Sequence, residues 1–288
     1  MIIDNMNAII EKAKVKVMAF YLDSLNYFSL VKAKLKRKRI VYSHYARVNN
    51  FGDRFNKDLV RFFDAELIYV SSYKKSEMAL TGSILGAYLR DFSGYIVGAG
   101  FILERYNRLN NNWKVKLIRG PLSAKQCGAT AGVVYGDPGI LASQIYTINK
   151  NKKYKLGILP HSRDVSIVKD IGFDKEILII HPRRKPSEVA KDIQQCEFIA
   201  SSSLHGLIFA DSFRIPNIHI KFSDNVIGGL HKFNDYYLGM EATPDFINFS
   251  SNTTINNIIE KCSLRYSEAY LVSRQKEIKD IIHTTIYN

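Results

Sequence analysis

The most informative segment of this chain is Phe198-Ile199-Ala200-Ser201-Ser202-Ser203-Leu204-His205-Gly206. Its first three residues are apolar and predict a short buried strand. The residues from 204 to 210 place their apolar side chains on one side of a helix, and the serines before them are N-cap candidates. A strand, a tight turn and a helix in this order are typical of an α/β unit.

The helix start expected at this turn favours an anion. Unpaired backbone N–H groups and the positive end of the helix dipole both attract negative charge. His205 lies in the first helical turn, where it could reach a bound anion and exchange a proton near neutral pH. A capped helix with a packed histidine explains the same residues equally well.

The same alternation extends along the chain and predicts parallel α/β units. We expect strands at 39–42, 66–70, 95–97, 115–118, 155–159, 177–180, 198–200 and 218–221, and helices at 56–63, 79–90, 186–195, 255–266 and 271–282. The polar run 149–153 is the best linker candidate. The predicted organisation is a basic helical extension (1–38), a first α/β domain (39–148) and a second one with closing helices (149–288).

Composition narrows the class of protein. The 288 residues suit two domains, and the 46% hydrophobic and 24% charged content is ordinary for a globular protein. The sequence has no apolar run of about 20 residues and no clear signal peptide. Its three cysteines lack metal spacing and fit a reducing compartment. We therefore expect a cytoplasmic protein.

The net charge of +14 indicates an anionic partner. An apolar and aromatic stretch at 17–30 precedes a basic block at 32–39, and the two together predict contact of residues 1–38 with an anionic membrane surface. The alternative is a helix that packs on the body and exposes its basic end. Zinc-finger spacing and ribonucleoprotein signatures are missing from the sequence, so no nucleic-acid partner is expected.

Several turns that follow predicted strands carry candidate site residues, and ligands of open parallel sheets bind beyond the carboxyl ends of strands. In the turn at 49–53, Gly52 permits close backbone approach and Asp53 could orient or deprotonate a sugar hydroxyl, unless the turn is only a helix cap. Arg119 ends a buried strand and needs an anion, which is either a ligand or an aspartate such as Asp137.

Other strand ends add histidines and positive charge. His161 and His181 each follow an apolar strand and are either site residues or packed structural histidines; Arg183, Lys221 and Lys232 favour an anion site. The sequence 98–100 begins like a dinucleotide fingerprint, but Leu103 stands where the third glycine belongs. We predict no metal and no serine nucleophile, because neither H-x-x-x-H spacing, a carboxylate cluster nor a G-x-S-x-G turn is present.

In their order along the chain, these turns resemble the polysaccharide pyruvyl transferase family, in particular its exopolysaccharide ketal-pyruvate branch. The resemblance covers roughly residues 40–240. It is carried by the segments NFGD (50–53), GAGFI (98–102), RGPLS (119–123), GDP (136–138), LPH (159–161), SSSLHGLIFAD (201–211), IPN (215–217) and KFNDYY (232–237).

The resemblance implies two Rossmann-like domains in a GT-B-like arrangement with an inter-domain cleft. It also implies transfer of a pyruvyl group from phosphoenolpyruvate to a sugar of an exopolysaccharide or capsule, which forms a ketal and releases phosphate. The acceptor would be a saccharide, lipid-linked at the inner face of the cell membrane, where the protein would be peripheral. No metal or organic cofactor is expected.

The resemblance also assigns roles to residues. His205 is the expected catalytic acid, and Asp53 or Asp235 would deprotonate the acceptor. Arg119 would bind the donor. Ser203 stands where several family members have arginine, so we expect Arg183 to supply the missing cation, with Lys221 or Lys232 as substitutes. The remaining expected contacts are Ser203, Leu204 and Gly206 with the donor, and Asn50, Gly52 and His161 with the acceptor.

Two other functions remain open from the sequence. The same architecture also serves glycosyltransferases that use a nucleotide-sugar donor. A non-enzymatic scaffold could bind anionic lipid or polysaccharide through the basic extension, although a scaffold would not need His205 and Arg119 at strand ends.

Overall fold

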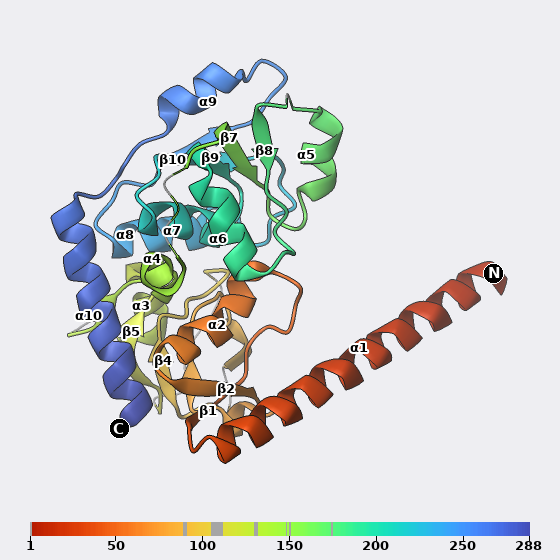
Figure 1. The fold of residues 1–288 in the computed structure, drawn as a ribbon, viewed down its shortest axis with the longest axis vertical. Coiled ribbons are helices and arrows are strands. Elements are labelled where there is room, and N and C mark those ends of the chain that lie inside the picture. The colour runs from red at the N-terminus through yellow and green to blue at the C-terminus, as the bar shows by residue number, and fades with distance from the viewer. Residues whose placement is uncertain are drawn as a thin grey trace.

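The structure is a computed structural model that describes residues 2–88, 91–104, 112–129, 132–147, 149, 151–173 and 175–288, with side chains of the first helix from Val17 onward. Helices and parallel strands alternate through both halves of the chain, as Figure 1 shows. The predicted mixed α/β class with parallel sheets is therefore confirmed. The GT-B-like arrangement, the inter-domain cleft and the domain boundaries remain predictions, and Lys150 of the expected linker lies outside the described residues.

The N-terminal half contains two parallel sheets that lie edge to edge. Ser43 Oγ donates to Met78 O at 2.6 Å and Glu77 N donates to Tyr42 O at 2.7 Å, which joins the two sheets. The strands are β1 (Arg39–Ser43) with β2 (Ala65–Tyr69), and β3 (Met78–Ala79), β4 (Tyr95–Val97), β5 (Lys114–Ile118) and β6 (Val134–Tyr135) in that order.

Short helices follow the strands of this half. They are α2 (Phe51–Phe62), α3 (Pro121–Cys127), α4 (Ala142–Ile145) and the 3₁₀ turns η1 (Tyr73–Lys75), η2 (Leu85–Tyr88) and η3 (Pro138–Leu141). The helix predicted at 79–90 is wrong. Met78 and Ala79 instead pair with β4, and Gly82 has a φ of 123°, which is incompatible with a continuous helix.

The C-terminal half has one five-stranded parallel sheet. Its strands β7 (Tyr154–Leu159), β8 (Ile177–Ile179), β9 (Cys196–Ser201), β10 (Asn217–Lys221) and β11 (Phe246–Asn248) lie in the order β11-β10-β9-β7-β8. From β7 the chain adds β8 on one side, and it then adds β9, β10 and β11 on the other side. The point where the strand order changes side, between β7 and β9, is where open α/β sheets bind ligands. The predicted strands of this half are confirmed within one or two residues at each end.

Helices cover both faces of this sheet. Buried residues of α6 (Pro186–Gln194) and α7 (Leu204–Ser212) belong to one apolar cluster, whereas those of α5 (Val165–Ile171) and α9 (Ile255–Lys261) belong to another on the opposite face. The remaining helices are α8 (His231–Gly239) and α10 (Glu268–Tyr287). The expected helix at 255–266 thus ends early, and the expected helix at 271–282 is longer than predicted.

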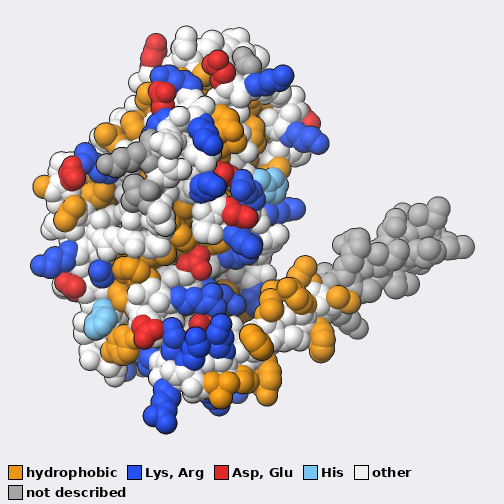
Figure 2. Space-filling view, in the orientation of Figure 1, with side chains coloured by type: hydrophobic (Ala, Val, Ile, Leu, Met, Phe, Trp, Pro, Cys, Tyr) orange, Lys and Arg blue, Asp and Glu red, His pale blue; other side chains and the backbone are white. Residues whose placement is uncertain are grey.

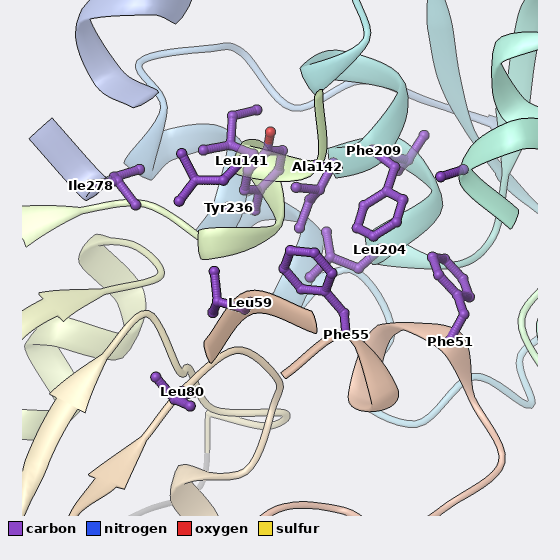
Figure 3. Close-up of a cluster of buried hydrophobic side chains, with 14 of the residues drawn as sticks. Phe51, Phe55, Leu59, Leu80, Leu141, Ala142, Leu204, Phe209, Tyr236 and Ile278 are labelled. Atoms are coloured by element: carbon purple, nitrogen blue, oxygen red, sulfur yellow. The ribbon is translucent and has the colours of Figure 1, made fainter. Parts of the chain in front are cut away.

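A single apolar cluster joins the two halves. Phe51 and Phe55 of α2 pack edge-on against Phe209 of α7, with ring centroids 5.3 and 5.2 Å apart (Figure 3). The C-terminal helix α10 returns along one side of the molecule to the N-terminal half, where buried Ile278 lies against Gly136 (Figure 1). These contacts fix the position of the strand ends of one half relative to those of the other half.

The helix α1 (Ile2–Leu35) extends away from the rest of the molecule (Figure 1). Asn26 anchors it, because its side chain accepts from Tyr69 N at 2.8 Å and donates to Tyr69 O at 3.0 Å. Ala33, two turns further on, is buried. The predicted helical extension is confirmed over Ile2–Leu35. None of the described helices is both long and apolar enough to cross a membrane.

Candidate active site

His205 lies in the first turn of α7 and receives contacts from the N-terminal half. Its Nε2 is 2.9 Å from Thr81 Oγ1, and the Thr81 hydroxyl donates to Asp137 Oδ1 at 2.8 Å. Because a hydroxyl has one proton, Nε2 must be the donor to Thr81, and the neutral ring carries its proton there. Asp137 Oδ2 lies 4.0 Å from Nε2, so its charge favours the imidazolium form.

A glycine allows the start of α2 to approach the imidazole. A Cβ atom on Gly52 would lie 2.1 Å from His205 Nδ1, whereas one on Gly139 would lie 3.6 Å from Cδ2, an ordinary contact distance. Gly52 belongs to the first turn of α2. The N-cap of this helix is Asn50, whose side chain accepts from Gly52 N at 3.0 Å. The helix-cap interpretation is therefore confirmed for Asn50. A contact of Asn50 or Gly52 with an acceptor remains a prediction.

Burial sets the protonation of His205. Its side chain is 13% exposed, and desolvation lowers its pKa below the ordinary value. Asp137 acts in the opposite direction, whereas the charges of Lys232 and Arg119 lower the pKa further. The imidazole is therefore neutral near pH 7, and an added negative charge beside it would favour protonation.

Asp53 and Lys232 bring two further titratable groups to the same place. Burial raises the pKa of Asp53 to about 7, although the charge of Lys232 opposes this shift. Lys232, on α8, is 6% exposed, and burial lowers its pKa to about 8. Within the described part of the chain, Lys232 Nζ has neither an ion pair nor a hydrogen bond, so this buried ammonium group lacks a close counter-ion.

The ends of β7 and β9 adjoin these groups. Ser202 Oγ donates to Asp164 Oδ2 at 2.6 Å and accepts from His161 N at 2.8 Å. Burial lowers the pKa of His161 to about 4, with the charge of Lys232 contributing in the same direction. His161 is therefore a neutral imidazole beside Lys232. Its role toward an acceptor remains a prediction.

Arg119 and Asp235 form a buried ion pair between the two halves. Arg119 Nε donates to Asp235 Oδ2 at 2.9 Å, and the guanidinium also donates to Ser83 Oγ and Phe101 O. Ser123 donates to the same carboxylate from N at 2.9 Å and from Oγ at 2.6 Å. An aspartate partner for Arg119 was one of the two alternatives, and the partner is Asp235 rather than Asp137. Neither a donor contact of Arg119 nor a base role of Asp235 is tested by this geometry.

Arg183 and Lys221 were also proposed to replace the arginine expected at position 203, and their surroundings differ from those of Lys232. Arg183 is exposed in the turn after the edge strand β8, where its backbone N donates to His181 Nδ1 at 3.2 Å. Lys221 pairs with exposed Asp224 at 2.5 Å. Of the three candidates, Lys232 is the one whose charge reaches His205, Asp53 and His161.

The serine run before α7 shapes the helix start. Ser203 occupies the N-cap position as expected, but its side chain makes no capping hydrogen bond; Ser201 Oγ instead accepts from Ser203 N at 3.0 Å. Leu204 is buried in the core, and a Cβ on Gly206 would lie 2.3 Å from Ser201 Oγ. Because the Leu204 side chain packs in the core and Gly206 has no side chain, any donor contact of these residues would have to come from backbone atoms.

Sequence reasoning missed Thr81, which links His205 to Asp137. The polar pair Thr81-Gly82 was hidden inside the predicted helix 79–90. Packing also accounts for the glycines at 98–100, since a Cβ on Gly98 would lie 2.1 Å from Pro138 and one on Gly100 would lie 2.4 Å from the Arg119 guanidinium carbon. Among the described residues, no three His, Cys, Asp or Glu side chains gather as a metal site would require.

A largely buried imidazole and carboxyl in the turns that follow parallel strands, with a buried ammonium group whose charge reaches both, are typical of an enzyme that acts on an anionic substrate. Comparison with known sequences gives the family. The profile described as polysaccharide pyruvyl transferase matches residues 20–224, and the chain belongs to this family.

Two curated proteins are similar to the chain over most of its length. The uncharacterized protein L143 of Acanthamoeba polyphaga mimivirus is 28% identical over 229 residues, which are 74% of this chain and 73% of that protein. The succinoglycan biosynthesis protein ExoV of Rhizobium meliloti (strain 1021) is 26% identical over 198 residues, which are 65% of this chain and 60% of that protein.

Proposed function

We propose that the protein transfers a pyruvyl group from phosphoenolpyruvate to a sugar of a surface polysaccharide or its lipid-linked precursor, forming a ketal and releasing phosphate. Family membership supports the pyruvyl group and the polysaccharide acceptor. The observation that carries the assignment to this site is the grouping of His205, Asp53 and Lys232 around the start of α7.

The donor is a small molecule with a carboxylate and a phosphate group. Lys232 is a suitable partner for one of them, because it is buried and lacks a counter-ion among the described residues. The backbone N–H groups of Leu204 and His205 open α7 and suit the other. The charge of Arg119 also reaches His205 and adds positive potential there, although the hydrogen bonds of Arg119 go to Asp235, Ser83 and Phe101. We thus assign to Lys232 the place of the arginine expected at Ser203.

His205 is the proposed acid. It is neutral in the free protein, and the negative charge of a bound donor would raise its pKa, with Asp137 holding the imidazolium through Thr81. Its proton goes to the methylene carbon of the donor, which becomes a methyl group. Positive charge then develops on the central carbon, which a sugar hydroxyl attacks.

Asp53 is the proposed base. Its pKa of about 7 suits proton transfer near neutral pH, whereas Asp235 is fully engaged with Arg119 and Ser123. Over the whole reaction two sugar hydroxyls each lose a proton. One proton balances the proton that His205 gives to the methyl group, and the other leaves with the phosphate as the second hydroxyl closes the ketal.

The experiment that tests this proposal measures phosphate release from phosphoenolpyruvate with and without saccharide acceptors. We expect release that depends on the acceptor and that falls at least 100-fold in His205→Gln, a variant close in size that cannot act as the acid. Unchanged thermal unfolding of the variant would show that the loss is chemical. Full activity of His205→Gln would exclude His205 as the acid.

Thermal unfolding in the presence of ligands separates the second candidate, a glycosyltransferase. Stabilisation of the protein against heat by nucleoside diphosphates, and not by phosphoenolpyruvate, would favour a nucleotide-sugar donor and contradict our proposal.

A further inference from the structure

The side of α1 that faces away from the body is apolar. Asn26 and Ala33 contact the body, and at 3.6 residues per turn the opposite side carries Phe20, Phe28 and Leu35. These three side chains are 76%, 68% and 80% exposed. Val17, Tyr21, Tyr27 and Val31 add to this side, and Figure 2 shows hydrophobic side chains along the described part of α1. A continuous exposed apolar surface of this kind marks an interaction site.

A groove of about 570 Å³ lies beside this helix. One wall is α1, with Met18, Tyr21 and Leu25. The other wall is formed by the loop after β1, by α2 and by the start of α6. It carries one carboxylate, Asp58, which accepts a hydrogen bond from Tyr146, and five cations: Arg47, Arg54, Lys57, Arg61 and Lys185. An apolar wall therefore faces a basic wall across the same space.

The basic wall has more positive charge than its neighbours balance. Arg47 pairs with Asp23 and Arg61 pairs with Glu66. Over the described residues, Arg54, Lys57 and Lys185 form no ion pair with a carboxylate. Burial lowers the pKa of Lys57, and the charges of Arg61, Arg47 and Arg54 contribute, whereas the charge of Glu66 opposes the shift. Like charges held this close together favour binding of an anion.

We propose that α1 and the basic groove beside it form a docking surface for an anionic phospholipid bilayer. The aromatic and aliphatic side of α1 lies in the bilayer interface, and phosphate head groups contact Arg54, Lys57 and Lys185. Phenylalanine and tyrosine are well suited to the interface, and each nearby cation strengthens binding to an anionic surface. The basic block at 32–39 lies at the end of α1 nearest the body and extends the same charge.

Charge argues for a bilayer rather than a second copy of the chain on this surface. Each chain has a net charge of +14, and a second copy would bring another basic groove toward the first. An anionic bilayer offers the complementary charge and an apolar interior together. Docking would also set the active site near the membrane, because Arg54 of the groove directly follows Asp53 on α2.

The test is sedimentation of the full chain with vesicles, without donor or acceptor, so that its result does not depend on the proposed reaction. We expect binding to vesicles of phosphatidylglycerol and phosphatidylcholine in equal parts, little binding to phosphatidylcholine alone, and a loss of binding as salt rises. The double variant Arg54→Gln/Lys57→Gln should weaken binding by about fivefold per charge removed. The variant Phe20→Ser/Phe28→Ser should weaken it at least tenfold.

Control variants remove two cations and one exposed apolar side chain elsewhere on the surface. Lys261→Gln/Lys276→Gln removes two exposed cations on α9 and α10, and Val272→Ser removes a side chain that is 58% exposed. Neither should change binding more than twofold. Equal binding to neutral vesicles, or equal effects of the control and groove variants, would overturn the proposal. So would a dimer in solution that Phe20→Ser/Phe28→Ser converts to a monomer, because a second copy would then cover this surface.

Discussion

The guanidinium of Arg119 and the carboxylate of Asp235 form an ion pair at 2.9 Å in which both side chains are buried. Arg119 directly follows β5 of the N-terminal half, and Asp235 belongs to α8 of the C-terminal half. The neighbouring backbone is equally close, since a Cβ on Gly120 would lie 1.8 Å from Asp235 O. This pair therefore fixes α8, and with it Lys232, against the strand ends of the other half.

Removal of one partner should destabilise the protein strongly. Asp235→Ala leaves the Arg119 charge buried without its counter-ion, and we expect the free energy of unfolding to fall by about 3–5 kcal/mol. Urea denaturation followed by circular dichroism measures this change. Lys155→Ala is the control, because it breaks an exposed pair with Glu197 and should cost less than about 1 kcal/mol. Equal losses in the two variants would contradict the prediction.

A methyl group on Gly52 should displace the imidazole of His205. The Cβ of Gly52→Ala would lie 2.1 Å from Nδ1, closer than any real contact, so the ring or α2 must shift. We expect pyruvyl transfer to fall about 100-fold, the size of loss that a misplacement near 1 Å produces. The measurement is the rate of acceptor-dependent phosphate release.

The matched control for this variant is Gly128→Ala at the end of α3. Its Cβ would meet nothing within 4 Å, although its φ of 64° makes any side chain unfavourable there. The control should lose about 1 kcal/mol of stability and keep its rate. A Gly52→Ala protein as active as this control would show that the close approach of Gly52 to His205 is not required.

The position of His205 follows from the local sequence. An apolar strand, polar turn residues and an apolar helical pattern define the start of α7 within a dozen residues, and each of these patterns acts over a short distance. The strand ends that carry Asp53, Arg119 and His161 were predictable in the same way. The expectation that they face one another follows from the parallel sheet.

The partners of these residues were not predictable, because they depend on how distant segments pack. Asp235 meets Arg119 across 116 positions of the chain. In the sequence, Lys232 has the pattern of a surface lysine in a polar segment. In the structure it is buried, because α8 packs against the other half. Arg183 has the same kind of place in the sequence, but it follows the edge strand β8 and is exposed. Thr81 was missed because the strand before it has only two residues.

The ionisation of Asp53 should make stability depend on pH. Its pKa is about 7 in the folded protein against an ordinary 3.8, so the folded state binds this proton more tightly. The associated stability is fully present below about pH 4 and is lost as pH rises through 7. Asp53→Asn lacks this dependence. The difference in free energy of unfolding, wild type minus variant, should therefore fall between pH 4 and 7 in urea denaturation and then level off. A constant difference would contradict the burial of this carboxyl.

Substitutions of Lys232 and of Arg183 should have different effects on the binding of phosphoenolpyruvate. If Lys232 holds an anionic group of phosphoenolpyruvate, Lys232→Gln should raise the dissociation constant about 10- to 100-fold in calorimetry, because a charge-assisted hydrogen bond is lost. Its melting temperature should not fall, since the lysine is buried without a counter-ion among the described residues and its charge costs stability. Lys276→Gln on the exposed side of α10 is the control and should bind as wild type. Weaker binding in Arg183→Gln together with unchanged binding in Lys232→Gln would instead place the donor near the turn after β8.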